Sequence, residues 1–347
     1  MLKTNNLLFL KAIFIIKKSL LRLLVIIKQM KNRLFIILSL SCLMLISCTK
    51  EIEIDIPEVK TKLVLNGLFT NDSVFCVNVS RTTNFSQNIT KYISDATVEL
   101  YQGNRQISNF IYTENGIYKS TIDYKPEIGK TYTIKILHDK YDNLYAENKV
   151  PLLPNVIQTE KTDSAYIDED GYYGSEAEIT INDSPNNKNY YEIKLIGYYF
   201  EDYSGIPGYE NNQTEDTVWH TRRLYLTGND AVLLNEGLTD YYPSEYPFSD
   251  TLFNGQSYTL KVHYLPPQTI LVVNDGEYNL AKNYQLIVVI NSVSEAYYKY
   301  KKKLIIHTEN QSGDIWDGTA NPVNMFSNIE GGYGIFAGYS SYIDTIP

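Results

Sequence analysis

The chain has 347 residues, of which 31 are Lys or Arg and 40 are Asp or Glu, and its formal net charge is −9. Residues 1–47 hold eight of the basic residues and none of the acidic ones, so the rest of the chain carries a net charge of −17. An acidic body of this kind lacks the basic face that nucleic acid or anionic lipid requires. Tyrosine occurs 31 times, which favours a strand-rich fold with exposed aromatic surfaces.

The stretch from Met30 to Cys48 has the order of a secretory signal. Lys31 and Arg33 form a short basic start, 34–46 is an apolar run of thirteen residues, and a small serine precedes Cys48. Thirteen apolar residues are too few to span a bilayer as a helix. The ending Leu-Ile-Ser-Cys resembles the lipobox of bacterial lipoproteins, which implies that Cys48 is acylated, for example with palmitate, and becomes the mature N-terminus.

Two other interpretations of this stretch exist. It is an ordinary secretory signal that ends beside a chance cysteine, or 1–47 as a whole forms a membrane anchor, although basic residues interrupt its apolar runs. We expect residues 1–47 to be a signal-peptide region whose true start is Met30, and residues 48–60 to be a lipidated tether. Two or three acyl chains would hold the tether stably, since each buried methylene contributes about 0.8 kcal/mol. Lys50, Glu51 and Glu53 in the tether resemble the acidic export signal of Bacteroidota lipoproteins, with a solvated linker as the alternative.

Residues 61–152 alternate apolar and polar residues in short runs that are separated by turn signals. Asn115-Gly116 joins two of the runs and is a strong hairpin signal, because both residues tolerate positive φ. Seven short strands within about ninety residues predict an immunoglobulin-like β-sandwich, which Pro151 and Pro154 end. The expected strands are 62–69, 74–80, 96–101, 106–113, 116–120, 131–138 and 144–150.

Residues 153–347 predict a second β-rich domain, so the expected fold is mainly β with two tandem sandwiches. A helix is expected at about 294–307, where Ser294-Glu295 provides a cap and apolar residues recur at helical spacing. The lysines within this helix are expected to form a solvated face. The expected strands of this half are 176–181, 190–200, 218–226, 257–265, 284–293 and 335–337.

A long aromatic insertion is predicted at about 200–255. Insertions of this length are usually functional or disordered, and tyrosine and tryptophan would supply rigid contacts for a partner. The alternative is a loop that packs over its own domain. The candidate partner-binding residues are Tyr203, Tyr209, Trp219, Tyr241, Tyr242 and Tyr246.

The sequence contains none of the catalytic motifs that we sought, including the G-x-S-x-G elbow and the H-E-x-x-H zinc helix. The four histidines lack metal-ligand spacing, and the acidic turn at 168–171 lacks the pattern of a calcium loop. We therefore expect no enzyme activity, no cofactor and no metal. Cys76, the one cysteine after Cys48, lies in a strand-like run and is expected to be a small core residue.

The C-terminal stretch 321–336, its approach 293–300 and the run Leu63-Val64-Leu65-Asn66-Gly67 carry a family resemblance. Together they resemble a family of Bacteroidota outer-membrane lipoproteins, domain of unknown function 4249, over essentially the whole mature chain. The resemblance implies a surface lipoprotein, often encoded beside a TonB-dependent outer-membrane receptor, and it brings no catalytic residues. Independently, the glycines from Gly331 to Gly338 predict tight turns or close backbone approach, and they do not link a strand to a helix as a phosphate loop would.

Five Asp-Ser or Asp-Thr pairs are each followed by an apolar residue. This triplet is the O-glycosylation acceptor of Bacteroidota, a feature that the resemblance implies. The alternative is that turn-to-strand junctions generate it, since aspartate suits turns and β-branched residues follow. The candidate glycan sites are Ser73, Ser164, Thr217, Thr251 and Thr345.

These observations predict a non-enzymatic surface lipoprotein that assists a TonB-dependent receptor in ligand capture or uptake. Its expected location is the outer membrane, facing the cell exterior, with acylated Cys48 in the bilayer. The expected partners are that receptor and a glycan or peptide ligand, with no nucleic acid. The alternatives are an adhesin or envelope scaffold, and a surface hydrolase, which would need a cleft with paired carboxylates.

Overall fold

The computed structural model describes residues 60–83, 91–168, 171–185, 187–200, 219–227, 230–267, 270–273, 276–279, 284–311 and 323–347, with Lys31 and Arg33. Contacts divide the chain into Met1–Glu58 and Val59–Pro347, and the fold below is that of the second unit. The signal, Cys48 and the tether up to residue 59 lie outside these residues, apart from Lys31 and Arg33. In the described part of the chain, no helix combines the length and apolarity that a membrane crossing requires.

All seven strands expected between residues 61 and 152 are present, each within two residues of its expected ends. Asn115 and Gly116 take positive φ of 50° and 78° between the fourth and fifth strands, which confirms the predicted hairpin. The strands are β1 (Leu63–Thr70), β2 (Cys76–Arg81), β3 (Thr97–Gln102), β4 (Arg105–Tyr112), β5 (Ile117–Ser120), β6 (Thr131–Leu137) and β7 (Leu144–Lys149).

The alternation along these strands buries one face of each. Leu65, Val79, Leu100, Ile134 and Ala146 come from five different strands and meet in one hydrophobic core. Each large aliphatic side chain buried there contributes about 1.5–3 kcal/mol.

Cys76 is exposed, so its expected place in the core is wrong. The alternation has the opposite phase to the one expected. Phe75, Val77 and Val79 point inward, and Cys76 points outward.

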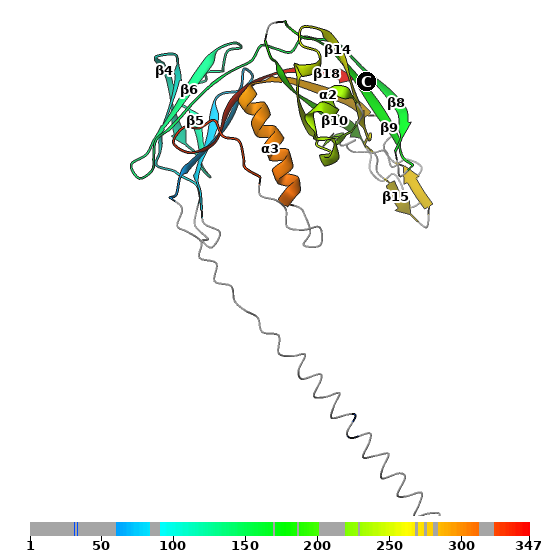
Figure 1. The fold of residues 1–347 in the computed structure, drawn as a ribbon, viewed down its shortest axis with the longest axis horizontal. Helices are drawn as coiled ribbons and strands as arrows, with labels where there is room; N and C mark the ends of the chain where they lie inside the picture. The colour runs from blue at the N-terminus through cyan, green and yellow to red at the C-terminus, as the bar shows by residue number, and fades with distance from the viewer. Residues whose placement is uncertain are drawn as a thin grey trace, which may run out of the picture. The chain divides into compact units, whose positions relative to one another are not determined.

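The second half is also strand-rich (Figure 1). It contains the long β8, the short β13 and the helix α2, none of which was expected, and two single 3-10 turns, η1 and η2. The bounds are β8 (Val156–Ile167), β9 (Tyr173–Asn182), β10 (Tyr190–Phe200), β11 (Trp219–Arg223), β12 (Leu226–Thr227), α2 (Ala231–Glu236), η1 (Thr239–Tyr241), β13 (Glu245–Ser249), η2 (Asp250–Leu252), β14 (Ser257–Tyr264), β15 (Ile270–Val273), β16 (Gly276–Asn279), β17 (Tyr284–Val293), α3 (Glu295–Gln311) and β18 (Tyr333–Ile346).

The fold is mainly β, as expected. One sheet has the order β11-β10-β17-β18-β1-β2-β5-β4-β3-β6-β7, with β13 also paired to β10, and a second has the order β12-β14-β9-β8. Ile193 and Val288 of the first sheet pack with Ile179 and Val262 of the second, so the two sheets enclose a second hydrophobic core. The described residues of the second half therefore form a β-sandwich.

The final strand, β18, joins both halves. Its first part pairs in parallel with β1, and its second part pairs antiparallel with β17. Phe336 enters the first core, where its ring centroid lies 4.5 Å from that of Phe69. Ile335 and Ala337 pack on the other face with Tyr297 of α3, which lies beside β18 in Figure 1. The domain boundary at residue 152 stays a prediction, and β18 pairs with strands from both sides of it.

Close backbone approach explains the glycines near the C-terminus. Gly334 has φ of +112°, and a Cβ there would lie 1.9 Å from the carbonyl oxygen of Leu65. Asn328 clamps the same strand, because its amide donates to Phe336 O at 2.8 Å and accepts from Phe336 N at 3.0 Å. The prediction of close approach at this signature is therefore confirmed.

Two helices are described, so the expectation of one helix in the second half is corrected. Asp230 caps α2 by accepting the backbone N–H of Val232 at 2.8 Å, and the helix ends at Gly237 with φ of 66°. The expected helix, α3, begins after Ser294, whose Oγ accepts the backbone N–H of Tyr297 at 3.4 Å. It runs four residues beyond its expected end, to Gln311.

Candidate functional site

A cavity of about 760 Å³ opens where four segments of the second half meet. The segments are the β8–β9 turn, the end of β11 with the residues before β12, the residue after η1, and the residues after β14. Exposed tyrosines are prominent in its lining, so we call it the aromatic cavity. The residues that define it here are Tyr166, Asp168, Tyr172, Arg222, Arg223, Tyr225, Tyr242 and Leu265.

The β8–β9 turn holds one wall of the aromatic cavity. Asp168 Oδ1 accepts the backbone N–H of Tyr172 at 2.7 Å, and Gly171 has φ of +88°, which closes the turn. The Tyr166 ring stacks on His263 with centroids 4.3 Å apart and an interplanar angle of 14°. Burial raises the pKa of Tyr166, so its hydroxyl stays protonated at neutral pH.

The remaining lining includes exposed tyrosines and the two arginines. Tyr225 and Tyr242 are 62% and 59% exposed, and Tyr242 has a left-handed φ of 43°. Arg223 donates to Glu245 Oε1 at 2.8 Å, which fixes its guanidinium. Arg222 lies on the same edge strand, and its side chain is exposed. Flat rings beside hydrogen-bonding and charged groups can bind a small polar ligand.

Of the six candidate partner-binding residues, the four that the structure describes are placed in four different ways. Tyr242 lines the aromatic cavity, and Trp219 is 44% exposed on β11, with its ring centroid 4.5 Å from that of Tyr198. Tyr241 is half-buried against the second core. Tyr203 and Tyr209 lie outside the described residues.

The prediction that Tyr246 contacts a partner is wrong. The residue is buried, and its hydroxyl donates to the carbonyl oxygen of Leu233 at 2.9 Å, so it packs α2 onto β13 instead of meeting a partner. Burial raises its pKa and keeps the hydroxyl a donor.

Sequence reasoning missed most of the aromatic cavity. Arg222 and Tyr225 lie in a segment that was expected to be a strand, and Tyr166 and Tyr172 lie on either side of the expected acidic turn. One local signal was available, because aromatic residues flank the turn at 168–171 on both sides. Nothing in the sequence tells that this turn faces β11.

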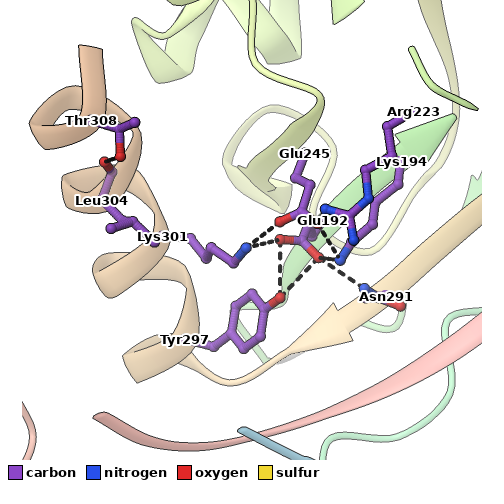
Figure 2. A network of polar contacts seen from close by, with 9 residues as sticks. All are labelled: Glu192, Lys194, Arg223, Glu245, Asn291, Tyr297, Lys301, Leu304 and Thr308. Carbon is purple, nitrogen blue, oxygen red and sulfur yellow. Dashed lines mark hydrogen bonds and ion pairs between the residues drawn. The ribbon is translucent and has the colours of Figure 1, made fainter. Parts of the chain in front are cut away.

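A buried carboxylate lies behind the edge strand (Figure 2). Glu192 on β10 is fully buried, and its oxygens accept the hydroxyl of Tyr297 at 3.0 and 2.9 Å and the amide of Asn291 at 2.9 Å. Lys194 Nζ lies 3.1 Å from it, and Lys301 Nζ lies 3.6 Å away. Burial at this depth is costly without such partners.

Glu245 connects this carboxylate to the aromatic cavity. It pairs with Arg223 at 2.8 Å, with Lys194 at 3.0 Å, and with Lys301. Burial raises the pKa of Glu245, but the hydrogen bonds and charges of Lys301 and Lys194 outweigh that effect and hold it at about 2. The group is therefore ionised at neutral pH.

A second buried carboxylate holds α3 in the same way. Glu236 accepts the backbone N–H and the hydroxyl of Ser249, both at 2.9 Å, and the ammonium of Lys302 at 2.7 Å, together with the hydroxyl of Tyr298. The expected solvated lysine face is therefore wrong for Lys301 and Lys302, which point at buried acids. Both carboxylates bind protein groups that dock α3, so this network is a structural clamp.

The other candidate residues lie on the surface or outside the described ranges. Ser73, Ser164, Thr251 and Thr345 are exposed, as an acceptor hydroxyl must be, and Thr217 is not among the described residues. Glycosylation at these residues stays a prediction.

Two of the four histidines each lie beside a single acid. His138 lies 3.1 Å from Asp95, and His263 lies 3.0 Å from Glu176. Within the described ranges no three His, Cys, Asp or Glu side chains gather closely enough to hold a metal ion.

A comparison with models of protein families gives a match over most of the chain. The model of the Domain of unknown function (DUF4249) matches residues 49–343. A comparison of the sequence with curated proteins finds no match.

Two solved structures show a remote likeness. One is a Corynebacterium diphtheriae protein described as membrane anchored, with 11% identity, 67% of this chain and 54% of that chain covered, and a TM-score of 0.20. The chain thus spans about half of that protein's length. The other is the B domain of a biofilm associated protein, with 10% identity, 81% and 85% covered, and a TM-score of 0.18.

Proposed function

Because the chain belongs to the family of the Domain of unknown function (DUF4249), we propose that it is a non-enzymatic lipoprotein of the outer membrane. It faces the cell exterior, captures a ligand there, and passes it to a TonB-dependent receptor.

The proposed anchor is Cys48. The family match begins at residue 49, directly after this cysteine, which fits a mature chain that starts at Cys48. Two or more acyl chains on one N-terminus would give stable membrane attachment, whereas one chain is marginal. The acidic charge of the remaining chain makes attraction to anionic lipid an unsuitable alternative anchor.

The observation that carries the capture role is the aromatic cavity. Its volume of about 760 Å³ lies within the range of small-ligand sites. Tyr225 and Tyr242 are each more than half exposed at its edge, where rigid rings bury area at a low entropy cost. The buried Glu192 network docks α3 behind β10, and its Glu245 holds Arg223 on β11, so the cavity wall is supported from behind.

The anchor is tested by labelling cells with an alkyne fatty acid. We expect label on the wild-type chain and none on Cys48→Ala, which should leave the membrane fraction. Cys76→Ala is the matched control, because Cys76 is an exposed thiol of the folded body, and it should keep its label. Label that persists on Cys48→Ala would refute the lipid anchor.

The receptor partnership is tested by purification of the native protein in mild detergent. We expect an outer-membrane receptor to co-purify with the wild type. Recovery of the protein without a receptor would contradict the partnership. If deletion of the protein also impaired attachment of the cells and left their growth on nutrients unchanged, an adhesin or scaffold would be favoured.

A further inference from the structure

The aromatic cavity holds one guanidinium that no described residue neutralises. Within the described part of the chain, no ion pair or hydrogen bond links the exposed Arg222 to another side chain. Its neighbour Arg223 is already bound to Glu245 at 2.8 Å. Asp168 is the one carboxylate among the described lining residues, and its Oδ1 accepts the Tyr172 backbone N–H. Among the residues that the structure describes, the cavity thus presents one positive charge without an acidic partner, on a strongly acidic body.

The backbone of Arg222 is fixed before any ligand arrives. β11 pairs antiparallel with β10, which places Arg222 opposite Gly197. A Cβ at Gly197 would lie 2.4 Å from Pro267, so this glycine allows the segment after β14 to pack close to the strand. A guanidinium on a paired strand loses less freedom on binding than one on a loop. Its fork matches the two oxygens of a carboxylate.

The tyrosines beside Arg222 indicate the remainder of the ligand. Tyr225 and Tyr242 present flat rings with polar hydroxyls, and both are more than half exposed. Such rings pack against a planar apolar face while their hydroxyls bond polar groups at its rim. A pyranose ring has this combination, with C–H groups on its faces and hydroxyls around its edge.

A peptide fits these observations less well. Peptides that bind sheets usually draw affinity from a long free row of backbone groups. The aromatic cavity is built from side chains of four separate segments, and β11 contributes only its last two residues to the lining.

We infer that the ligand of the aromatic cavity is an acidic oligosaccharide, whose carboxylate is bound by Arg222 while a sugar ring stacks on the exposed tyrosines. This inference rests on the proposed capture function and names its substrate class. It makes Arg222 the residue that selects acidic sugars over neutral ones.

The test is calorimetric titration of the purified lipoprotein in mild detergent with three probes. These are trigalacturonate, its methyl ester and triglutamate, so that the first pair has the same sugar rings and differs in whether the carboxylates are charged or methylated. We expect trigalacturonate to bind at least about tenfold more tightly than the ester, and to weaken with added salt. Arg222→Gln should reduce the acid's affinity to that of the ester and leave the ester's affinity unchanged.

Two controls keep the result specific. Arg105→Gln removes an exposed arginine on β4 and should change neither affinity. Tyr225→Ala should weaken the acid and the ester equally, because it removes the stacking surface and leaves the charge. A thermal melt of each variant confirms that it is folded.

The inference would be overturned by an ester that binds as tightly as the acid, by an Arg222→Gln variant that keeps the discrimination, or by triglutamate that binds more tightly than either sugar. Absence of binding by both sugars would also overturn it. The proposed function would still stand in that case if Cys48 is acylated and a receptor co-purifies, because those measurements do not depend on the cavity.

Discussion

At the residue scale, the groups that matter most for the docking of α3 are two buried carboxylates. Glu192 is fully buried, and Glu236 has a side chain that is only 2% exposed. Each is satisfied by a tyrosine hydroxyl and a lysine from α3, together with groups from the sheet. Removal of one partner would leave a buried charge without its hydrogen bonds, which costs more than the pair itself contributes.

Glu245 gives a prediction about pH. Its pKa of about 2 in the folded chain lies below its ordinary value of 4.5, so its stabilising contribution is present above pH 4.5. That contribution is lost as pH falls from about 4.5 to 2, and it amounts to about 2 kcal/mol after allowance for solvent screening. Glu245→Gln should therefore unfold more easily in urea at pH 7, with a flatter stability profile through this window.

Glu114→Gln is the control for this profile, because Glu114 is an exposed acid on a hairpin. It should leave the curve unchanged. If Glu245→Gln merely shifted the wild-type curve downward by a constant amount, the ionised pairing with Lys301 and Lys194 would be disproved.

At the element scale, α3 is docked through its polar side chains as much as through its apolar ones. Tyr297 and Lys301 lie one turn apart and reach Glu192, while Tyr298 and Lys302 reach Glu236. Side chains four residues apart share one helix face, so two adjacent stripes of the helix each meet one acid. The helix is thus held at two points, by Glu192 on β10 and by Glu236 at the end of α2.

Tyr297→Phe tests this docking. It keeps the ring and deletes the hydroxyl that donates to both oxygens of Glu192, so we expect a loss of about 2 kcal/mol in the free energy of unfolding. Tyr300→Phe is the matched control on the same helix, where burial alone raises the pKa of the tyrosine, and it should cost under about 1 kcal/mol. Chemical denaturation measures both, and equal losses would contradict the docking role of the Glu192 bond.

At the scale of the whole molecule, β18 is the strand on which both halves depend. It supplies Phe336 to the first core and pairs with β17 in the second half. Its path past β1 exists only because Gly334 leaves room for the Leu65 carbonyl. A substitution at Gly334 should therefore destabilise the strands on both sides of residue 152.

Gly334→Ala is the corresponding prediction. The new Cβ would collide with backbone, so we expect a loss of about 3 kcal/mol or more, with hydrogen exchange accelerated in both β6 and β14. Gly103→Ala is the control, because Gly103 also has positive φ but no atom within 4 Å of the added Cβ, and it should cost about 1 kcal/mol. Exchange that accelerates in β6 alone would show that the halves unfold independently.

The sequence predicts the fold best where one face of a strand is buried. Alternation located every strand from β1 to β7, because each has an apolar side facing the core. It missed β8, an edge strand of twelve residues that are mostly exposed and show no alternation. It also missed α2, although Asp230 and Gly237 provide start and stop signals, because six residues are too few to show helical periodicity.

The candidate site was harder to predict for a different reason. Lys301 and Lys302 were expected to face solvent, because a lysine run gives no hint of acids more than fifty residues away. The aromatic cavity combines the β8–β9 turn with β11, which belong to different sheets, and only the packing of the two sheets brings these together. Composition did indicate aromatic surfaces, but which tyrosines are buried, such as Tyr246, depends on the pairing of β13 with β10.

The pairing of β1 has a mechanical consequence. β1 is the first strand of the body, so any tension along the chain before residue 60 reaches it first. It is flanked by β2 on one side and by β18 on the other, and it runs parallel to β18 over seven residue pairs. Tension along β1 therefore loads these hydrogen bonds together in shear instead of opening them one at a time. A body held from its N-terminal side in flowing medium would resist extraction of this strand, whereas the same force on an edge strand would peel it away.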